Sequence, residues 1–345
     1  MIAIIGSAPS SGSTLLADLI DSSEFSACGE ELDLFANKNF YDFNKFKKDP
    51  FKNSGTCSIY LNRTYFNTRN FHMYGFNEGM FLQLLEQSKD QQAFLKGLRD
   101  VFIKYRSKDK DSVWFEKTPQ NINAIEEFLN IFSKSYFIFM VRNPIYVFSS
   151  MLKRGISPEF SLVTWFISAS KFYRFMGHER TILVKYEELV EKPFQIASSV
   201  ISKVLGKEIL STVIEEGFLN NSYRKENAPR IKSWGVSDYG VIQNANTKEI
   251  EKETIELFCK YKNLKISKGY AKKFGLSTLS FTELIEAYGY SDQINELVKG
   301  VKIPDFKFTL QEKKDLYKKW KADLVLGEAK FTDLPKYLAP VTRIG

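Results

Sequence analysis

The chain has 345 residues, of which 43% are hydrophobic and 26% charged, and this composition excludes a wholly disordered protein. Its net charge of +8 is spread along the sequence, so a solvated, lysine-rich surface explains most of it and no nucleic-acid partner is expected. No apolar run reaches the length of a membrane span and the first residues lack a signal-peptide pattern, so we expect a cytoplasmic location without stable membrane insertion.

The first predicted elements are a strand at Ile2–Ile5, a loop of small residues and a helix that begins at Ser13. Small residues let the backbone approach an anion, and the first turn of a helix points N–H donors and a favourable dipole at it. The stretch therefore predicts a phosphate cradle, although an ordinary strand–loop–helix turn without a ligand is the alternative. The residues expected to bind the anion are Ser10, Ser11, Gly12, Ser13 and Thr14.

The loop differs from the phosphate-binding loop of kinases. That motif has four residues between its glycines and a lysine after the second one. Here five residues separate Gly6 from Gly12, and Ser13 stands where the lysine would be. The missing lysine argues against hydrolysis of a nucleoside triphosphate.

Further strands are predicted at 111–115, 135–141 and 181–185, and helices between them. Such alternation predicts a doubly wound parallel sheet with ligands at the carboxyl ends of the strands. Residues 36–75 have weak periodicity and are predicted to form a long irregular insertion that lines the substrate site. The predicted helices lie at 79–106 (two helices), 121–132, from 144, 159–176, 194–205, 247–262, 281–289, 291–299 and 310–325. We expect a main domain at 1–264 and a mainly helical extension at 265–345.

Two of these segments resemble motifs of one enzyme family. The loop GSAPSSGSTLL after the first strand and VRNPIYVFSSML at 141–152 are similar to the nucleotide motifs of sulfotransferases that use 3′-phosphoadenosine 5′-phosphosulfate (PAPS). The resemblance covers about residues 1–235 and implies an α/β, P-loop-NTPase-like three-layer fold. It also implies that the loop holds the 5′-phosphosulfate, and that Arg142 and Ser150 bind the 3′-phosphate. A guanidinium suits bidentate phosphate contact.

Catalytic residues follow from the same resemblance. Cys28-Gly29-Glu30-Glu31 resembles the segment that carries the catalytic glutamate of tyrosylprotein sulfotransferases, which implies Glu31 as the general base. Glu30 is an equally available carboxylate, and His72 is a rival base because some sulfotransferases use histidine. The segment FEKTP at 115–119 resembles the lysine-bearing segment of these enzymes, so Lys117 is expected to contact the bridging oxygen or the transferred sulfuryl group.

The remaining nucleotide contacts are implied by position. Tyr186, in VKYEELV, resembles the aromatic residue that packs beside the adenine. The basic loop at 222–234 lies where the family often places a second 3′-phosphate contact. Arg230 and Lys232 are the candidates there, and Ser222 is a weaker one.

One departure from the family concerns the cradle. Family members usually have a lysine or arginine at the position of Ser10, and we expect Lys117 to compensate for its absence. The missing cation leaves a non-catalytic 3′-phosphonucleotide-binding module as an alternative. A nucleotide kinase is disfavoured by the missing loop lysine.

The leading hypothesis is an enzyme that transfers the sulfuryl group of PAPS to a hydroxyl acceptor and releases adenosine 3′,5′-bisphosphate (PAP). A glycan, a lipid-linked sugar or a small natural product is the expected acceptor, with protein tyrosine as the alternative. No metal is expected, because the three cysteines and two histidines have no metal-site spacing. The sequence leaves the oligomeric state open.

Overall fold

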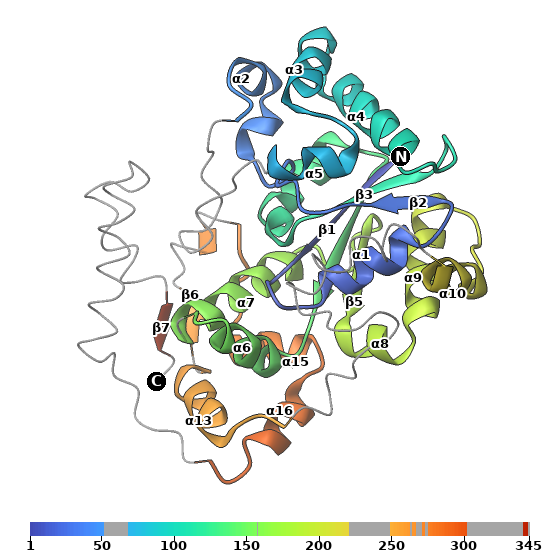
Figure 1. The fold of residues 1–345 in the computed structure, drawn as a ribbon. Helices are drawn as coiled ribbons and strands as arrows, with labels where there is room; N and C mark the ends of the chain where they lie inside the picture. Colours follow the sequence, from blue (N-terminus) through green and yellow to red (C-terminus); the bar gives the residue numbers. More distant parts are fainter. Residues whose placement is uncertain are drawn as a thin grey trace.

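A five-stranded parallel sheet forms the centre of the structure, a computed structural model (Figure 1). The structure describes residues 1–51, 68–156, 158–220, 249–262, 264–266, 271–272, 275–301 and 341–343. The strands follow the spatial order β2-β3-β1-β4-β5, and all four neighbouring pairs are parallel. Their bounds are Ile2–Ser7 (β1), Ser26–Cys28 (β2), Val113–Lys117 (β3), Tyr136–Val141 (β4) and Thr181–Lys185 (β5). The predicted α/β fold, P-loop-like with helices on both sides of a parallel sheet, is confirmed.

The central strand β1 is apolar from Ile2 to Ile5 because helices cover both faces of the sheet. Ala3 and Ile5 point into one hydrophobic cluster. It is formed with α1 (Ser13–Asp21), α9 (Pro193–Leu205) and α10 (Ser211–Asn220). Ile4 belongs to the other cluster. That cluster is formed with α4 (Gln91–Tyr105), α5 (Ile125–Ile131) and α7 (Pro158–Tyr173), which lie on the opposite side of the sheet (Figure 1). The two buried clusters make the three layers of the fold.

The helices between the strands have the following bounds in chain order. They are α1 (Ser13–Asp21), η1 (Lys38–Tyr41), α2 (Phe43–Lys48), η3 (Thr68–Tyr74), α3 (Glu78–Gln87), α4 (Gln91–Tyr105), η4 (Pro119–Ala124), α5 (Ile125–Ile131), α6 (Pro144–Lys153), α7 (Pro158–Tyr173), α8 (Tyr186–Glu191), α9 (Pro193–Leu205) and α10 (Ser211–Asn220). The helices predicted from 79 to 205 are therefore present, within a few residues of their expected bounds.

The prediction of an irregular insertion at 36–75 is wrong where the structure describes it. Side-chain caps start two short helices there: Asn37 accepts from the Asn39 N–H at 2.9 Å, and Asp42 accepts from the Lys45 N–H at 3.2 Å. Phe40 and Phe46 are fully buried, so the aromatic residues of this part build the core. Strand β2 and helix α8 were also absent from the prediction, because each is too short for a periodic pattern.

The later part of the described chain is helical, with α13 (Lys252–Tyr261), α15 (Phe281–Ala287) and α16 (Ser291–Leu297). A capping box of Ser280 and Glu283 starts α15, and Phe281 packs into the same cluster as α7. Two short strands, β6 (Leu264–Ile266) and β7 (Val341–Arg343), pair antiparallel. The predicted helix at 310–325 and the basic loop at 222–234 lie outside the described residues.

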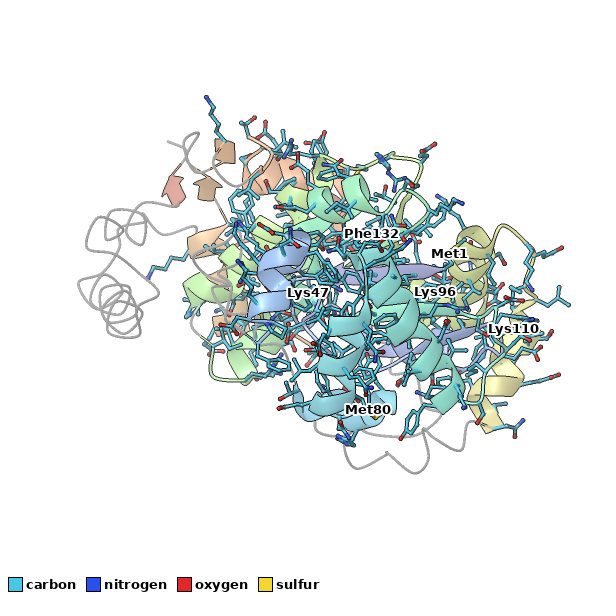
Figure 2. All side chains as sticks on the ribbon, turned by 90° about the horizontal axis from the view of Figure 1, so that it is seen from above. Met1, Lys47, Met80, Lys96, Lys110 and Phe132 are labelled. Carbon is cyan, nitrogen blue, oxygen red and sulfur yellow. The ribbon has the colours of Figure 1, made fainter. Side chains whose placement is uncertain are left out.

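The surface of the described part agrees with a dispersed positive charge. Figure 2 shows Lys47, Lys96 and Lys110 well separated, on α2, on α4 and in the loop before β3. Within the described ranges, no helix is long and apolar enough to cross a bilayer.

Candidate active site

The segments singled out in the sequence meet along one edge of the sheet. All five strands are parallel, so their carboxyl ends lie at the same edge. Each strand brings one segment there: the loop 8–12 after β1, Glu30 and Glu31 after β2, Lys117 at the end of β3, Arg142 after β4 and Tyr186 after β5. The sheet thereby assembles the candidate site from parts that are far apart in the chain.

The loop after β1 has the backbone and the hydroxyls of an anion cradle. Ser10 and Gly12 adopt left-handed backbone angles, with φ of 64° and 88°, which turn the chain tightly into α1. No side chain caps the first turn of α1 at Gly12. The hydroxyls of Ser7 and Ser11 are buried and have no hydrogen-bond partner among the described residues. Unpaired buried donors at a helix N-terminus fit an anionic ligand.

Arg142 and Tyr186 stack beside this cradle. A Cβ atom at Gly12 would lie 2.1 Å from Cδ2 of Tyr186, so the tyrosine ring rests directly on the glycine. The guanidinium carbon of Arg142 lies 4.5 Å from the centre of the same ring, and Nη1 donates to the Ser10 carbonyl at 3.2 Å. These contacts leave Nε of Arg142 buried and unpaired within the described part of the chain.

The electrostatics of Arg142 also favour an anion. Burial lowers the pKa of Arg142, and the neighbouring Tyr186 and Glu187 oppose this effect. Within the described ranges, Arg142 makes no ion pair, because no carboxylate there lies within 4.0 Å. A buried guanidinium without a carboxylate in direct contact is costly, and a bound phosphate would lower that cost.

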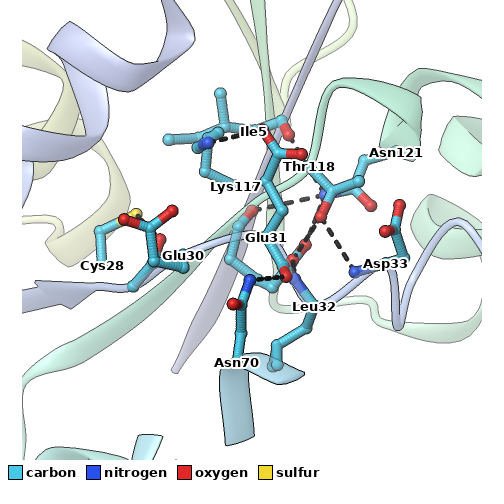
Figure 3. A network of polar contacts seen from close by, with 12 residues as sticks. Ile5, Cys28, Glu30, Glu31, Leu32, Asp33, Asn70, Lys117, Thr118 and Asn121 are labelled. Atoms are coloured by element: carbon cyan, nitrogen blue, oxygen red, sulfur yellow. Dashed lines mark hydrogen bonds and ion pairs between the residues drawn. The ribbon is translucent and has the colours of Figure 1, made fainter. Parts of the chain in front are cut away.

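On the other side of the cradle, Lys117 and Glu31 form a buried ion pair. Nζ of Lys117 donates to Oε1 of Glu31 at 2.8 Å, with only 4% and 18% of the two side chains exposed (Figure 3). Burial acts to lower the pKa of Lys117, but the charges of Glu31 and Glu30 and the hydrogen bond outweigh it and raise that pKa. The lysine therefore stays protonated at the site. Glu30 makes no hydrogen bond to Lys117 among the described contacts, so its charge alone acts on the lysine.

Side chains at the end of β3 fix the turn that carries Glu31. Glu116 is fully buried, and its Oε1 accepts from the Leu32 N–H at 3.1 Å and from the Thr118 hydroxyl at 2.6 Å (Figure 3). Its Oε2 accepts from Nδ2 of Asn121 at 2.6 Å. Thr118 in turn accepts from the Asp33 N–H at 3.1 Å. The strand that supplies Lys117 thus also fixes the backbone on which Glu31 stands.

Helix η3 holds the same turn from the other side. Nδ2 of Asn70 donates to the Glu31 carbonyl at 2.7 Å, and the Tyr74 hydroxyl donates to the Glu30 carbonyl. Gly29 has no room for a side chain, because a Cβ atom would lie 2.6 Å from the Tyr74 ring. Glu31 is therefore positioned by tertiary contacts on two sides.

The sequence model described as Sulfotransferase family matches residues 3–204, which include the cradle, Glu31, Lys117 and Arg142. The chain belongs to the sulfotransferase family. No curated protein matches the sequence.

Three sulfotransferases are among the solved structures that match this chain. The sulfotransferase domain from the Synechococcus PCC 7002 olefin synthase is 18% identical over 74% of this chain and 92% of its own, with a TM-score of 0.43. The sulfotransferase domain from the curacin biosynthetic pathway is 16% identical over 75% and 95%, with a TM-score of 0.44. A sulfotransferase from Alicyclobacillus acidocaldarius is 12% identical over 83% and 94%, with a TM-score of 0.37.

The sulfotransferase has a second guanidinium at the cradle, which the sequence did not reveal. Nη1 of Arg154, the residue after α6, donates to the Ser10 hydroxyl at 3.2 Å. Arg142 and Arg154 thus both contact Ser10, the position where the expected cation is missing. Lys117, which is expected to compensate, contacts Glu31, and its compensating role stays a prediction. The only sequence signal for Arg154 was its place one helical turn after Ser150.

The other predicted site residues of the sulfotransferase are placed as follows. Ser13 and Thr14 form the first turn of α1, and Ser150 is half-buried on α6. His72 lies on η3 with its side chain exposed. Ser222, Arg230 and Lys232 lie outside the described residues.

Proposed function

We propose that this chain is a PAPS-dependent sulfotransferase that sulfates a hydroxyl group of a glycan, a lipid-linked sugar or a small natural product. The buried Glu31–Lys117 pair beside the cradle is the observation on which the proposal rests. It provides a carboxylate that can accept a proton and a cation that can stabilise a leaving oxygen, at the edge where family members bind their donor.

The residues at the cradle fit PAPS. The unpaired Ser11 hydroxyl and the first turn of α1 would bind the 5′-phosphosulfate. Arg142 and Ser150 would bind the 3′-phosphate, and Tyr186 would pack beside the adenine. When bound, PAPS supplies the sulfuryl group for transfer. The phosphate oxygen that carried this group stays with PAP.

Glu31 and Lys117 divide the chemistry between them. Glu31 takes the proton of the acceptor hydroxyl while the hydroxyl oxygen bonds to sulfur. The acceptor therefore does not have to ionise before it attacks. Lys117 has three N–H donors, of which one goes to Glu31 among the described contacts. The others can stabilise the negative charge on the leaving phosphate oxygen. Positioning and electrostatics then supply the catalysis, as in phosphoryl transfer.

Substitution of the two neighbouring carboxylates tests this assignment. Glu31→Gln should lower turnover with labelled PAPS by about 10²-fold or more, while PAP still binds. Glu30→Gln is the matched control, because it also removes a carboxylate whose charge acts on Lys117 but which makes no hydrogen bond to it among the described contacts. Normal turnover in Glu31→Gln, or loss only in Glu30→Gln, would reject Glu31 as the base.

Separate experiments identify the acceptor and test the alternative functions. Labelled PAPS is offered with glycans, lipid-linked sugars, phenolic and aliphatic natural products and a tyrosine peptide, and transfer to the peptide alone would favour a protein-tyrosine sulfotransferase. Thermal stabilisation by PAP without transfer to any acceptor would favour a non-catalytic nucleotide-binding module. Stabilisation by ATP and not by PAP would reject both.

A further inference from the structure

We infer that α15 and α16, at Phe281–Leu297, complete the donor site by fixing the turn that carries Arg142. This inference rests on the proposed PAPS-dependent function, and it assigns a role to a segment beyond the span that the family model matches. The residues that act here are Tyr290 and Gln293. They are positioning residues, because they act through the turn at Arg142 and Asn143.

One carboxylate joins the ends of two strands to this segment. Oε1 of Glu187, in the first turn of α8, accepts from the Asn143 N–H at 2.9 Å. Oε2 of the same side chain accepts from the Tyr290 hydroxyl at 2.8 Å. Asn143 directly follows Arg142, so the tyrosine reaches the 3′-phosphate motif through a single intervening side chain.

Asn143 is held at its backbone N–H and at both polar atoms of its side chain. Besides the contact of its N–H with Glu187, its Nδ2 donates to Oε1 of Gln293 at 3.0 Å. Its Oδ1 accepts from the Ile145 N–H at 3.2 Å and so caps α6. Asn143 is fully buried, which leaves the turn little freedom while Tyr290 and Gln293 are in place.

The joint between α15 and α16 lies close to the end of β5. Tyr290 is 2% exposed, and Nζ of Lys185 lies 5.6 Å from the centre of its ring. Gly289 has a φ of +75°, and a Cβ atom there would lie 3.2 Å from the same Nζ. Lys185 pairs in register with Val141, the residue before Arg142. Two separate contacts therefore place this joint against the strand ends that carry Arg142 and Tyr186.

Recognition of the 3′-phosphate should depend on these contacts. Tyr290→Phe leaves Oε2 of Glu187 without its donor, so the carboxylate no longer holds the Asn143 turn in one position. The shift reaches Arg142, whose predicted ligand is the 3′-phosphate. Binding of PAP should therefore weaken, while adenosine 5′-monophosphate, which lacks that phosphate, should bind as before.

Calorimetry with PAP and adenosine 5′-monophosphate tests the inference on full-length protein. Tyr290→Phe should weaken PAP binding about tenfold and leave the monophosphate unchanged. Tyr288→Phe is the matched control, because this buried tyrosine also loses one hydrogen bond, from its hydroxyl to the Ala169 carbonyl at 2.8 Å. A merely structural role for Tyr290 would make the two variants alike.

A second pair of variants covers the case in which Tyr290→Phe does not fold. Gln293 is exposed, so Gln293→Ala preserves the core and should also weaken PAP selectively, with the exposed Asn295→Ala as its control. An unchanged ratio of PAP to monophosphate affinity in folded Tyr290→Phe or Gln293→Ala would overturn the inference. If the wild-type protein itself binds no PAP, the proposed function fails first.

Discussion

Substitution of Gly12 by alanine tests the geometry of the donor cradle. Gly12 has a φ of 88°, in the left-handed region, and its missing side chain makes room for the Tyr186 ring. An added Cβ would lie 2.1 Å from Cδ2 and 2.4 Å from Cε2 of that ring. Both distances are too short for non-bonded carbon atoms. Gly12→Ala therefore changes both the backbone preference and the position of the tyrosine.

The two costs can be separated. The left-handed conformation costs alanine about 1–2 kcal/mol of folding free energy. Ordinary contact begins near 3.4 Å, so the ring must move by about 1.3 Å. That movement breaks its stacking on Arg142 at 4.5 Å. We expect an additional loss of PAP affinity of about 10- to 100-fold, which corresponds to about 1.4–2.8 kcal/mol.

Gly206→Ala is the control for the backbone cost. Gly206 ends α9 with a φ of 68°, and a Cβ atom there would meet no atom within 4 Å. Urea unfolding should show a loss of about 1–2 kcal/mol in Gly206→Ala and a larger loss in Gly12→Ala, where the displaced ring adds to the backbone cost. Calorimetry with PAP should show a loss only in Gly12→Ala. If Gly12→Ala binds PAP as the wild type does, the packing of Tyr186 on the cradle is not what binding requires.

Two further substitutions have defined outcomes. Arg154→Ala should weaken PAP binding about tenfold in calorimetry at low salt, because its guanidinium lies at the Ser10 hydroxyl. Lys153→Ala removes the same charge from the neighbouring exposed position and should have little effect on PAP binding. Equal losses of PAP affinity in the two variants would mean that Arg154 acts only through its charge. Burial and the charges of Glu31 and Glu116 raise the pKa of Asp33 to about 8 from its ordinary 3.8. The folded state therefore holds this proton more tightly than the unfolded state, and stability falls as the pH rises from about 4 to 8. Asp33→Asn, which tolerates the left-handed φ of 59° at this position, should raise the free energy of unfolding by about 1–3 kcal/mol at pH 8 and much less at pH 5. An equal gain at both pH values in urea titrations would contradict this assignment.

Local patterns account for the parts of the site that were predicted correctly. The apolar runs that became β1, β4 and β5, and the glycine–serine loop before α1, are signals within a few neighbouring residues. Parallel strands then place the segments after them at one edge of the sheet, whatever the details of packing. This is why the strand pattern alone predicts that Lys117 and Arg142 lie at one edge, whereas Glu31, which follows the unpredicted β2, was placed there only by the family resemblance.

Contacts between distant residues account for what was missed. The insertion at 36–75 looked irregular because its helices are short and depend on caps and on burial of Phe40 and Phe46. The choice between Glu30 and Glu31 had no local signal, since the two are adjacent and identical. Only the fold brings Lys117 to one of them, across 86 residues of chain.

The sequence by itself determined the fold class, the family and the set of segments at the site, because periodicity and short motifs are local properties. The tertiary structure decided which side chains pair within that site. Arg154 reaches Ser10 across 144 residues, and Tyr290 reaches Glu187 across 103. Neither pair leaves a trace in local spacing, because each depends on how helices pack against the ends of the strands.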